Sequence, residues 1–483
     1  MHNKIFGYAL VFTLISSVLA SAYPVLDEES YLYIAEEMSL SRPYDWMLPW
    51  PPYSQSYRYA HPPLFLLWVK VGVLLFAQSI GWLKLFLGLP FRLLLGFSAG
   101  WFFHAQIPKN QNHALMWVVS PIVLMVGARS AMPDLMLCAL GTSAMAFFLS
   151  ASTWRGYLLC GVLLGCAGWI KYPGLLLWIP ILFACSSRKN LAWIALGFVS
   201  IWGIGEVWLW SIYDDWHLKV VLSTADHVGR GPLWDRSIGF FMRLFVGCPF
   251  LLLCVVQRRI WMLATVVLLV PLYFLLGEMT MGERLVASLW IAIPFVGMSI
   301  CVRRLDFFSV WWLTLFVGVC VTHNFASPRY LVLGMVPLVI LVSREIEGIS
   351  SRWLYALGSM SLLLSAVVSF AEHAHAQETI QLVERLEVQP NMYYSGEWTF
   401  RWAMRKKGAL LWKGEEGVLV QPKQAVGGEK PKRAQNKSTI EGEEGIRILL
   451  DRENSVGYYS ETLGFWPLGF HRGAMEELSV WKP

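Results

Sequence analysis

Two adjacent carboxylates, Asp27 and Glu28, directly follow the first long apolar stretch of this 483-residue chain. The spacing of Asp27, Tyr31 and Met38 suits one face of a helix on a membrane surface. Asp27 would lie near the helix N-terminus, where the helix dipole favours an anion. This arrangement would hold a carboxylate at the lipid–water boundary, ready to accept a proton or hold a cation. The alternative is a solvated helix start in which Asp27, Glu28 and Glu29 do no chemistry.

Three further charged residues interrupt or end apolar runs. Arg129 and Asp134 lie in the segment ARSAMPDLML, and Lys171 lies in the turn KYP between two apolar runs. Ionisable groups at membrane depth cost about 2.5–3.5 kcal/mol each on insertion scales, so they usually have a partner or a task. Two alternatives stay open: an ion pair of Arg129 with Asp134 that only holds a helix bundle, and Lys171 extending from a short helix to the surface.

His61 and Arg329 complete the set of candidate residues. His61 precedes Pro62-Pro63, and Arg329-Tyr330 follow the segment HNFASP. A polar residue in a stiff turn would also account for His61, and an interface anchor for Arg329. Taken together, the carboxylates suit a proton or a cation, whereas Lys, Arg and His suit phosphate oxygens. This combination is what group transfer from a lipid phosphate requires.

The composition indicates that lipid is the main solvent of the chain. Hydrophobic residues make up 56% and charged residues 15%, and the mean hydropathy is +0.49, whereas soluble domains carry about 25% charged residues. The apolar runs approach the ~20 residues that a membrane-spanning helix needs. Runs such as 260–276 do not alternate with polar residues, which excludes a transmembrane β-barrel. The net charge of +6 is spread over short loops, so it indicates topology rather than nucleic-acid binding.

The positions of Lys and Arg predict the topology, because cytoplasmic loops carry their excess. The predicted cytoplasmic loops are 104–113, 186–190, 257–259, 303–306 and 343–352. The predicted spans are 5–22, 85–103, 114–127, 134–150, 157–170, 173–185, 191–212, 238–256, 260–276, 285–301, 308–322, 330–342 and 353–371. A full crossing by 64–80 would break the parity of these loops, so this run is predicted to lie along or re-enter the outer interface. The result is about thirteen transmembrane helices, with the N-terminus inside and the C-terminus outside.

The two ends of the chain call for separate interpretation. A secretory signal ending at Ala20-Ser21-Ala22 is the alternative to an uncleaved first span, which we favour because the residues that follow it look functional. After residue 371 the composition becomes polar, which predicts a transmembrane domain over 1–371 and a small soluble domain over 372–483. Strands are expected at 389–394 and 446–450, and a helix at 398–407 closed by Gly408. The eight cysteines lie in or beside apolar runs without CxxC spacing, so they are interpreted as buried hydrophobes rather than disulfides or metal ligands.

Five segments occur in an order that resembles a known group of enzymes: DEESY, HPPLFLLW, ARSAMPDLML, GCAGWIKYPGLLL and SPRYLVLGMVPL. The chain resembles bacterial membrane glycosyltransferases of the protein O-mannosyltransferase and aminoarabinose (lipid A) transferase type, which have the GT-C fold. The resemblance covers about residues 5 to 345, and it lies in the order and spacing of the motifs rather than in any one of them. It implies an all-α GT-C-like bundle with outer juxtamembrane helices in the first loop (23–63) and a small α/β C-terminal domain.

The resemblance also implies roles for the candidate residues. Asp27 would be the principal catalytic carboxylate with support from Glu28, and Asp134 would be the second acidic residue. Lys171, Arg129, Arg329 and His61 would hold the phosphate of a polyprenyl-phosphate sugar donor. The aromatic side chains of Tyr31, Tyr57, Tyr330 and Trp50, and those of Trp46 and Tyr53, would line or cover the sugar.

Some features depart from this pattern or leave it open. In the pattern of the aminoarabinose transferases that this chain resembles, Lys typically precedes the Pro-Pro pair. Here His61, a weaker and pH-dependent cation, takes that position. This difference puts in doubt that the chain uses the sugar donor of those enzymes. A divalent metal cation between Asp27 and Asp134 stays an alternative without a diagnostic ligand set. The predicted function is glycosyl transfer from a lipid-linked sugar to a lipid, polysaccharide or protein acceptor at the periplasmic face of a bacterial inner membrane. A lipid or sugar transporter and a non-catalytic scaffold of the same fold are the alternatives.

Overall fold

The computed structural model describes most of the chain in thirteen segments. They are residues 2–25, 27–46, 61–76, 79–107, 121–129, 132–225, 232–257, 259–276, 279–323, 326–387, 389–424, 436–458 and 465–482. The structural statements below concern these residues.

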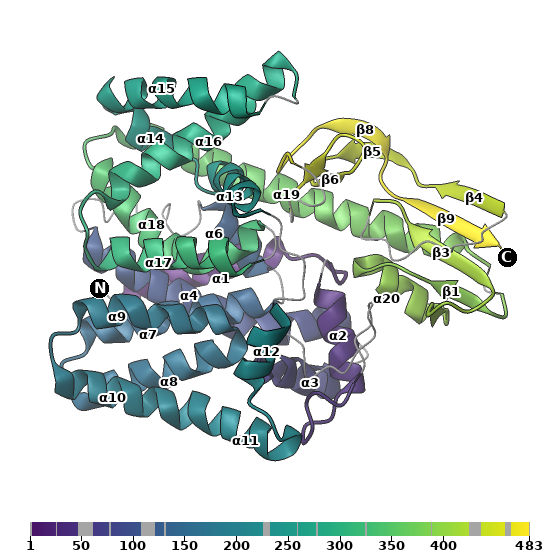
Figure 1. Cartoon of the computed structure of the whole chain (residues 1–483), viewed down its shortest axis with the longest axis horizontal. Helices are drawn as coiled ribbons and strands as arrows, with labels where there is room; N and C mark the ends of the chain where they lie inside the picture. Colours follow the sequence, from purple (N-terminus) through teal and green to yellow (C-terminus); the bar gives the residue numbers. More distant parts are fainter. Residues whose placement is uncertain are drawn as a thin grey trace.

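A helical bundle forms the larger part of the molecule, and a small sheet domain lies at one end of it (Figure 1). The bundle consists of α1 (His2–Val18), α2 (Glu28–Glu37), α3 (Leu64–Phe76), α4 (Ile80–Gln106), α6 (Ile122–Arg129), α7 (Pro133–Ser150), α8 (Trp154–Ile170), η3 (Tyr172–Leu177), α9 (Trp178–Ala184), α10 (Arg188–Phe198), η4 (Val199–Gly203), α11 (Ile204–Tyr213), α12 (His217–Ala225), α13 (Leu233–Gly247), α14 (Leu251–Val256), α15 (Arg259–Leu275), α16 (Met281–Val302), α17 (Phe307–Thr322), η5 (Pro328–Leu331), α18 (Val332–Glu345) and most of α19 (Ser351–Arg385). The predicted fold class, an all-α membrane bundle with a small α/β C-terminal region, is confirmed.

The chain is a multi-pass membrane protein. Among the described residues, five helices are long and apolar enough to cross a membrane: Ile80–Gln106, Pro133–Ser150, Arg188–Tyr213, Met281–Val302 and Ser351–Arg385. Six shorter apolar helices accompany them. The predicted interfacial run forms α3, which is too short to cross ~30 Å of hydrocarbon upright. The total number of spans and the orientation of the termini stay predictions.

One predicted span differs from the structure, and another lies partly outside the described residues. The run 238–256 does not form one helix, because α13 ends at Gly247 and α14 begins only at Leu251. Pro249 lies in this break, where its missing N–H and its ring oppose a continuous helix. Of the predicted span 114–127, only the part from Ile122 lies in a described helix, α6, which runs on to Arg129.

The C-terminal region combines one helix with short strands. The strands are β1 (Met392–Tyr394), β2 (Leu410–Leu411), β3 (Val418–Pro422), β4 (Asn436–Glu441), β5 (Glu444–Arg447), β6 (Leu450–Asp451), β7 (Val456–Gly457), β8 (His471–Ala474) and β9 (Glu477–Lys482), and the helix is α20 (Trp398–Lys406). Five of them form a sheet of order β2-β1-β3-β9-β4, parallel at β1 and antiparallel at β9. The predicted helix and its closing glycine are confirmed, because α20 is followed by Gly408 with φ +88°.

Helix α19 joins the bundle to the sheet region without a break. It continues through the predicted domain boundary at 371/372 and ends only at Arg385. Its last turns carry Leu382 and Val383, which belong to the core of the sheet region together with Phe400 and Val420. In Figure 1 this helix extends from the bundle into the C-terminal strands. A single helix therefore contributes to both hydrophobic cores.

Besides α19, a buried arginine connects the C-terminal region to the bundle. Arg243 on α13 is inaccessible to solvent and donates hydrogen bonds to the carbonyl oxygens of Gly457 (2.5 Å) and Tyr458 (3.2 Å). Carbonyl groups satisfy the guanidinium donors here, which lowers the cost of burying the charge. The loop after β7 is thereby tied to the bundle.

Two glycines let α8 and α10 approach with their backbones in contact. A Cβ atom at Gly161 would lie 2.0 Å from the carbonyl oxygen of Ile194, and one at Gly197 would lie 2.2 Å from that of Leu158. Helices in membranes associate through such small residues, because close packing rather than the hydrophobic effect drives their contact.

The Gly161 contact predicts a large effect of added side-chain volume. Gly161→Val should separate α8 from α10 and lower the unfolding free energy by about 1–3 kcal/mol or more, visible as a lower melting temperature of the detergent-solubilised protein. The matched control is Gly81→Val in α4, because a Cβ there meets nothing within 4 Å. Equal melting temperatures for the two variants would contradict the packing.

Glu476 links the C-terminal strands to α19 through a buried carboxylate. Its Oε2 atom lies 3.2 Å from Nε2 of His375 on α19, and its Oε1 atom accepts hydrogen bonds from the backbone N–H groups of Gln424 (2.8 Å) and Glu477 (2.9 Å). Burial alone would raise the pKa of Glu476, but these hydrogen bonds and the charge of His375 hold that pKa below its ordinary value of 4.5.

The lowered pKa predicts acid sensitivity. Because the folded-state pKa lies below the unfolded one, ionised Glu476 contributes stability above about pH 4.5, and that stability is lost as the pH falls through the lower folded value. Glu476→Gln should therefore melt at a lower temperature than wild type at pH 7, and the gap should close toward about pH 3. Glu444→Gln is the control, since Glu444 is exposed. A gap of constant size across this range would show that ionisation of Glu476 is unimportant.

Candidate active site at the outer helix ends

The predicted helix after the first span is confirmed as α2, and its place on the membrane surface stays a prediction. Asp27 occupies its N-cap position, and the helix ends at Glu37, where Met38 turns to extended backbone. The buried residues of α2 include Glu29 and Tyr31. This helix packs against both α3 and α20, so the segment that carries Asp27 contacts the bundle on one side and the C-terminal region on another.

The Asp27 carboxylate forms an ion pair with the guanidinium of Arg329. The bond joins Asp27 Oδ2 to Arg329 Nη1. Arg329 is held in the short helix η5, which begins at Pro328 and leads into α18. Burial raises the pKa of Asp27, but the attraction and hydrogen bond of Arg329 outweigh it, so the pKa lies below its ordinary value. The Asp27 side chain keeps 29% of its surface exposed, so an ionised carboxylate is accessible to a substrate.

Asp134 forms an ion pair with Lys171, which is distant in sequence. Oδ1 of Asp134, in the first turn of α7, lies 2.8 Å from Nζ of Lys171, which separates α8 from η3. Both side chains are only 4% exposed, which rules out the alternative that Lys171 extends to the surface. The second carboxylate oxygen, Oδ2, is buried and has no hydrogen-bond partner among the described residues.

Tyr330 brings the two ion pairs together. Its hydroxyl accepts a hydrogen bond from Nη2 of Arg329 (3.1 Å). The guanidinium carbon of Arg329 lies 5.0 Å and Nζ of Lys171 5.2 Å from the centre of its ring, within reach of cation–π attraction. Five predicted site residues, Tyr330 among them, thus form one cluster, contributed by the starts of α2 and α7, the turn after α8, and η5.

A third buried pair, which the sequence analysis missed, fixes the chain beside Asp27. Nζ of Lys84 on α4 lies 2.7 Å from Oε2 of Glu28 and donates to the carbonyl oxygen of Tyr23 (3.0 Å). The same Glu28 oxygen accepts a hydrogen bond from the N–H of Val25 (3.0 Å). The signal was a lysine inside the apolar run 80–106, where a charge requires a partner. Glu28 therefore supports Asp27 by holding the preceding backbone.

A second missed cation supports the end of α6. Arg92 on α4 is almost fully buried and donates to the carbonyl oxygen of Ala128 (2.8 Å) and to the hydroxyl of Ser17 (3.0 Å). It thereby joins α1, α4 and α6. The side chain of the neighbouring Arg129 lies outside the described part of the structure.

His61 and Tyr31 lie side by side near this cluster. The centres of their rings are 6.4 Å apart, and the carbonyl oxygen of His61 accepts a hydrogen bond from the hydroxyl of Tyr44 (2.6 Å). Trp46 is buried, and its indole N–H donates to the carbonyl of Pro43 (2.8 Å). The predicted sugar-covering residues Trp50, Tyr53 and Tyr57 lie outside the described residues.

The described residues do not assemble a metal site. Asp27 and Asp134 each have a cation as partner, and no group of three His, Cys, Asp or Glu side chains that could hold a metal ion occurs in the described segments. All eight cysteines are free. The alternative of a divalent cation stays untested, and no step below is derived through one.

Comparison with known proteins gives matches of structure but none of sequence. No family model matches the chain, and no curated protein matches it. Among solved structures, ArnT from Cupriavidus metallidurans in the apo state is 15% identical over 86% of this chain and 92% of that chain, with a TM-score of 0.40, and the values for the same protein bound to undecaprenyl phosphate are equal. The Archaeoglobus fulgidus oligosaccharyltransferase is 13% identical over 84% of this chain and 62% of its own, with a TM-score of 0.45.

A further match is arabinosyltransferase EmbB from Mycobacterium smegmatis, 12% identical over 90% of this chain and 46% of its own, with a TM-score of 0.34. These proteins are GT-C fold glycosyltransferases, the group that the sequence motifs resemble. At such identities and TM-scores the likeness says nothing of donor or acceptor, which are argued below from the site itself.

Loss of one partner of the buried Asp134–Lys171 pair should strongly lower the unfolding free energy, and removal of the other partner should restore most of it. Lys171→Met should lower the unfolding free energy by about 3–5 kcal/mol, because it leaves Asp134 charged and uncompensated. Adding Asp134→Leu should recover most of this loss, since replacing both partners by apolar groups is often neutral. Melting of the purified variants tests this.

The control for this cycle is an exposed pair of the same composition, Lys219 with Asp215 (3.1 Å). Lys219→Met should change the unfolding free energy by no more than about 1 kcal/mol. A Lys171→Met protein as stable as this control would contradict the buried pair.

Proposed function

We propose that the chain is an integral membrane glycosyltransferase that moves a sugar from a polyprenyl-phosphate-linked donor to a hydroxyl or phosphate group of an acceptor. The observation that carries the proposal is the cluster at the outer helix ends, in which an accessible Asp27 carboxylate lies beside two cations. We place the reaction on the periplasmic face of a bacterial inner membrane, with a lipid, polysaccharide or protein as acceptor. The N-terminus would be cytoplasmic and the C-terminal region periplasmic.

Asp27 is suited to act as the general base. Its low pKa keeps it ionised at neutral pH, so it can accept the proton of an acceptor hydroxyl or orient that hydroxyl for attack. As the acceptor oxygen bonds to the anomeric carbon of the sugar, the bond from that carbon to the phosphate oxygen breaks. Its electron pair leaves with the polyprenyl phosphate. General-base help of this kind contributes about 10²–10⁴-fold to the rate.

Arg329 and Lys171 are suited to compensate the charge of the leaving phosphate. In the structure each is neutralised by a carboxylate, Asp27 and Asp134 respectively. An anionic phosphate that enters between them can share these cations, and fixed cations in a water-poor site favour the growth of negative charge on it. A shift of Arg329 toward the phosphate would also free Asp27 to take up a proton.

A long apolar groove supports a lipid-linked donor. The groove, of ≈ 1060 Å³, is lined mainly by apolar side chains of α13, α16, α19 and the C-terminal region, among them Phe245, Trp290, Leu364 and Trp466. Most of these walls belong to membrane helices, where hydrocarbon is the natural occupant. Ile122 also lines the groove, and it begins α6, whose other end at Arg129 lies about 10 Å away along the helix axis.

The transporter and the catalytically inactive scaffold remain as alternatives. A transporter usually places ionisable groups near the bilayer midplane, on discontinuous helices, whereas the clustered charges of this site lie at helix ends. A scaffold would keep the bundle without chemistry at Asp27. A measured transfer activity would distinguish an enzyme from a scaffold.

The decisive experiment is transfer by the purified protein, reconstituted with polyprenyl-phosphate sugars and bacterial membrane extract. Asp27→Asn should reduce kcat by about 10²–10⁴-fold, while the protein remains folded. Asp215→Asn is the control, because Asp215 is an exposed carboxylate that pairs with the exposed Lys219 of α12. Equal transfer by wild type and Asp27→Asn would exclude Asp27 as the base, and no transfer by wild type from any donor would favour the scaffold.

A further inference from the structure

We propose that Arg401 of the C-terminal region is a positioning residue for Asp27, acting through a buried ion pair with Glu29 that fixes helix α2. The proposal rests on the function proposed above for Asp27. It makes the C-terminal region part of the active enzyme rather than an appended domain.

The Arg401–Glu29 pair is fully buried. Nε of Arg401 lies 3.3 Å from Oε2 of Glu29, and both side chains are 0% exposed. Nη1 of Arg401 also lies 3.4 Å from the hydroxyl of Ser30, to which it donates. Arg401 is one of two guanidiniums that contact Glu29, the other being that of Arg405, and loss of a buried ion pair is destabilising. The contact therefore holds the first turn of α2, directly after Asp27, against α20.

Arg405 also contacts α2, both in its first turn and near its C-terminal end. Its guanidinium contacts Glu29 (3.4 Å) and Glu36 (2.7 Å), and it lies 4.4 Å from the centre of the Tyr33 ring. Glu29 and Glu36 are about 10 Å apart along the helix axis. Two arginines of α20 thus fix both the position and the direction of α2.

The segment before Asp27 is held by the same helix. The Thr399 hydroxyl donates to the carbonyl oxygen of Pro24 (2.7 Å). Trp398, the first residue of α20, has φ +62°, a left-handed conformation that is strained for an aromatic residue. This strained residue lies where α20 contacts the segment that precedes Asp27.

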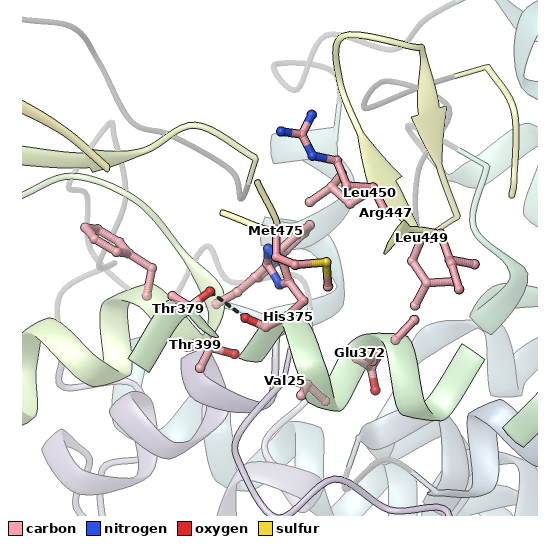
Figure 2. A pocket seen from close by; sticks show the side chains of 13 residues that line it. Val25, Glu372, His375, Thr379, Thr399, Arg447, Leu449, Leu450 and Met475 are labelled. Carbon is pink, nitrogen blue, oxygen red and sulfur yellow. Dashed lines mark hydrogen bonds between the residues drawn. The ribbon is translucent and has the colours of Figure 1, made fainter. Parts of the chain in front are cut away.

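A narrow cavity lies between α19, α20 and the segment before Asp27, and its small size shows how closely they pack. Figure 2 shows Val25, Thr399, and His375 and Thr379 of α19 among the side chains that line it. Its volume is ≈ 40 Å³, room for only two or three waters and too small for a sugar. The cavity is therefore a packed interface rather than a substrate site, and it leaves the backbone before Asp27 little freedom.

The electrostatics of Glu29 agree with this role. Burial raises the pKa of Glu29 to about 7, although Arg401 and Arg405 attract its charged form. With this pKa the carboxyl is about half ionised at neutral pH, and the two guanidiniums stabilise its ionised form.

Asp27 is consequently held from two sides. Arg329 of the bundle binds its carboxylate, and α20 of the C-terminal region fixes the helix that begins with it. Misplacement of a catalytic group by about 1 Å can cost about 10²-fold in rate. Loss of the α20 contact should therefore lower kcat while substrate binding, which Arg401 does not touch, changes little.

The experiment compares full-length Arg401→Gln with wild type by sugar transfer from polyprenyl-phosphate donors and by hydrogen exchange of the α2 amides. We expect kcat to fall about 100-fold with KM nearly unchanged, and exchange of α2 to rise about 100-fold. Arg401→Lys, which keeps the charge, should recover part of the rate. The matched control is Arg472→Gln, which removes an exposed arginine–glutamate pair of the same region and should change neither readout.

The double variant Arg401→Gln with Glu29→Gln covers the case in which the single variant does not fold. It removes both charges of the buried Arg401–Glu29 pair, and it should fold with α2 loosened and kcat low. Wild-type α2 exchange and wild-type kcat in a folded single or double variant would overturn the inference. If wild type itself transfers no sugar, the proposed function fails, while faster α2 exchange in the variants would still support the fixing of α2 by Arg401.

Discussion

The cost of a charge in a low-dielectric environment is the constraint on which this structure depends. A buried ion loses several kcal/mol of hydration unless an opposite charge and hydrogen bonds replace it. Lys171 therefore requires Asp134 and Lys84 requires Glu28, although each pair is far apart in sequence. Satisfying these pairs determines which helix ends must meet, and the accessible carboxylate of Asp27 is built on the arrangement that results.

Part of the site could be predicted from sequence because charge is rare in apolar runs. Asp134, Lys171 and Arg329 each stood out for this reason, and the parity of the loops placed them on one face. Their partners could not be predicted in the same way. The contact of Asp134 with Lys171 depends on how α7 and α8 are packed, and hydropathy contains no information about that.

The fold, like the site, could be predicted only in part from the sequence. Long apolar runs such as 285–301 predicted helices well, and Gly408 marked the end of α20. The continuation of α19 to Arg385 was not predicted, because the composition turns polar at the membrane surface whether or not the helix stops there. The role of Arg401 also lay beyond the sequence, since arginines are common in polar segments and nothing local distinguishes a buried one.

The unbroken helix α19 has a mechanical consequence. With 35 residues it is about 52 Å long, well beyond the ~30 Å of the hydrocarbon layer, and the excess forms part of the C-terminal core. A span tilts when the thickness of the bilayer changes. Because α19 continues into the C-terminal core, such a tilt would also move the β-sheet and α20, so their position relative to the other helices depends on the thickness of the surrounding lipid.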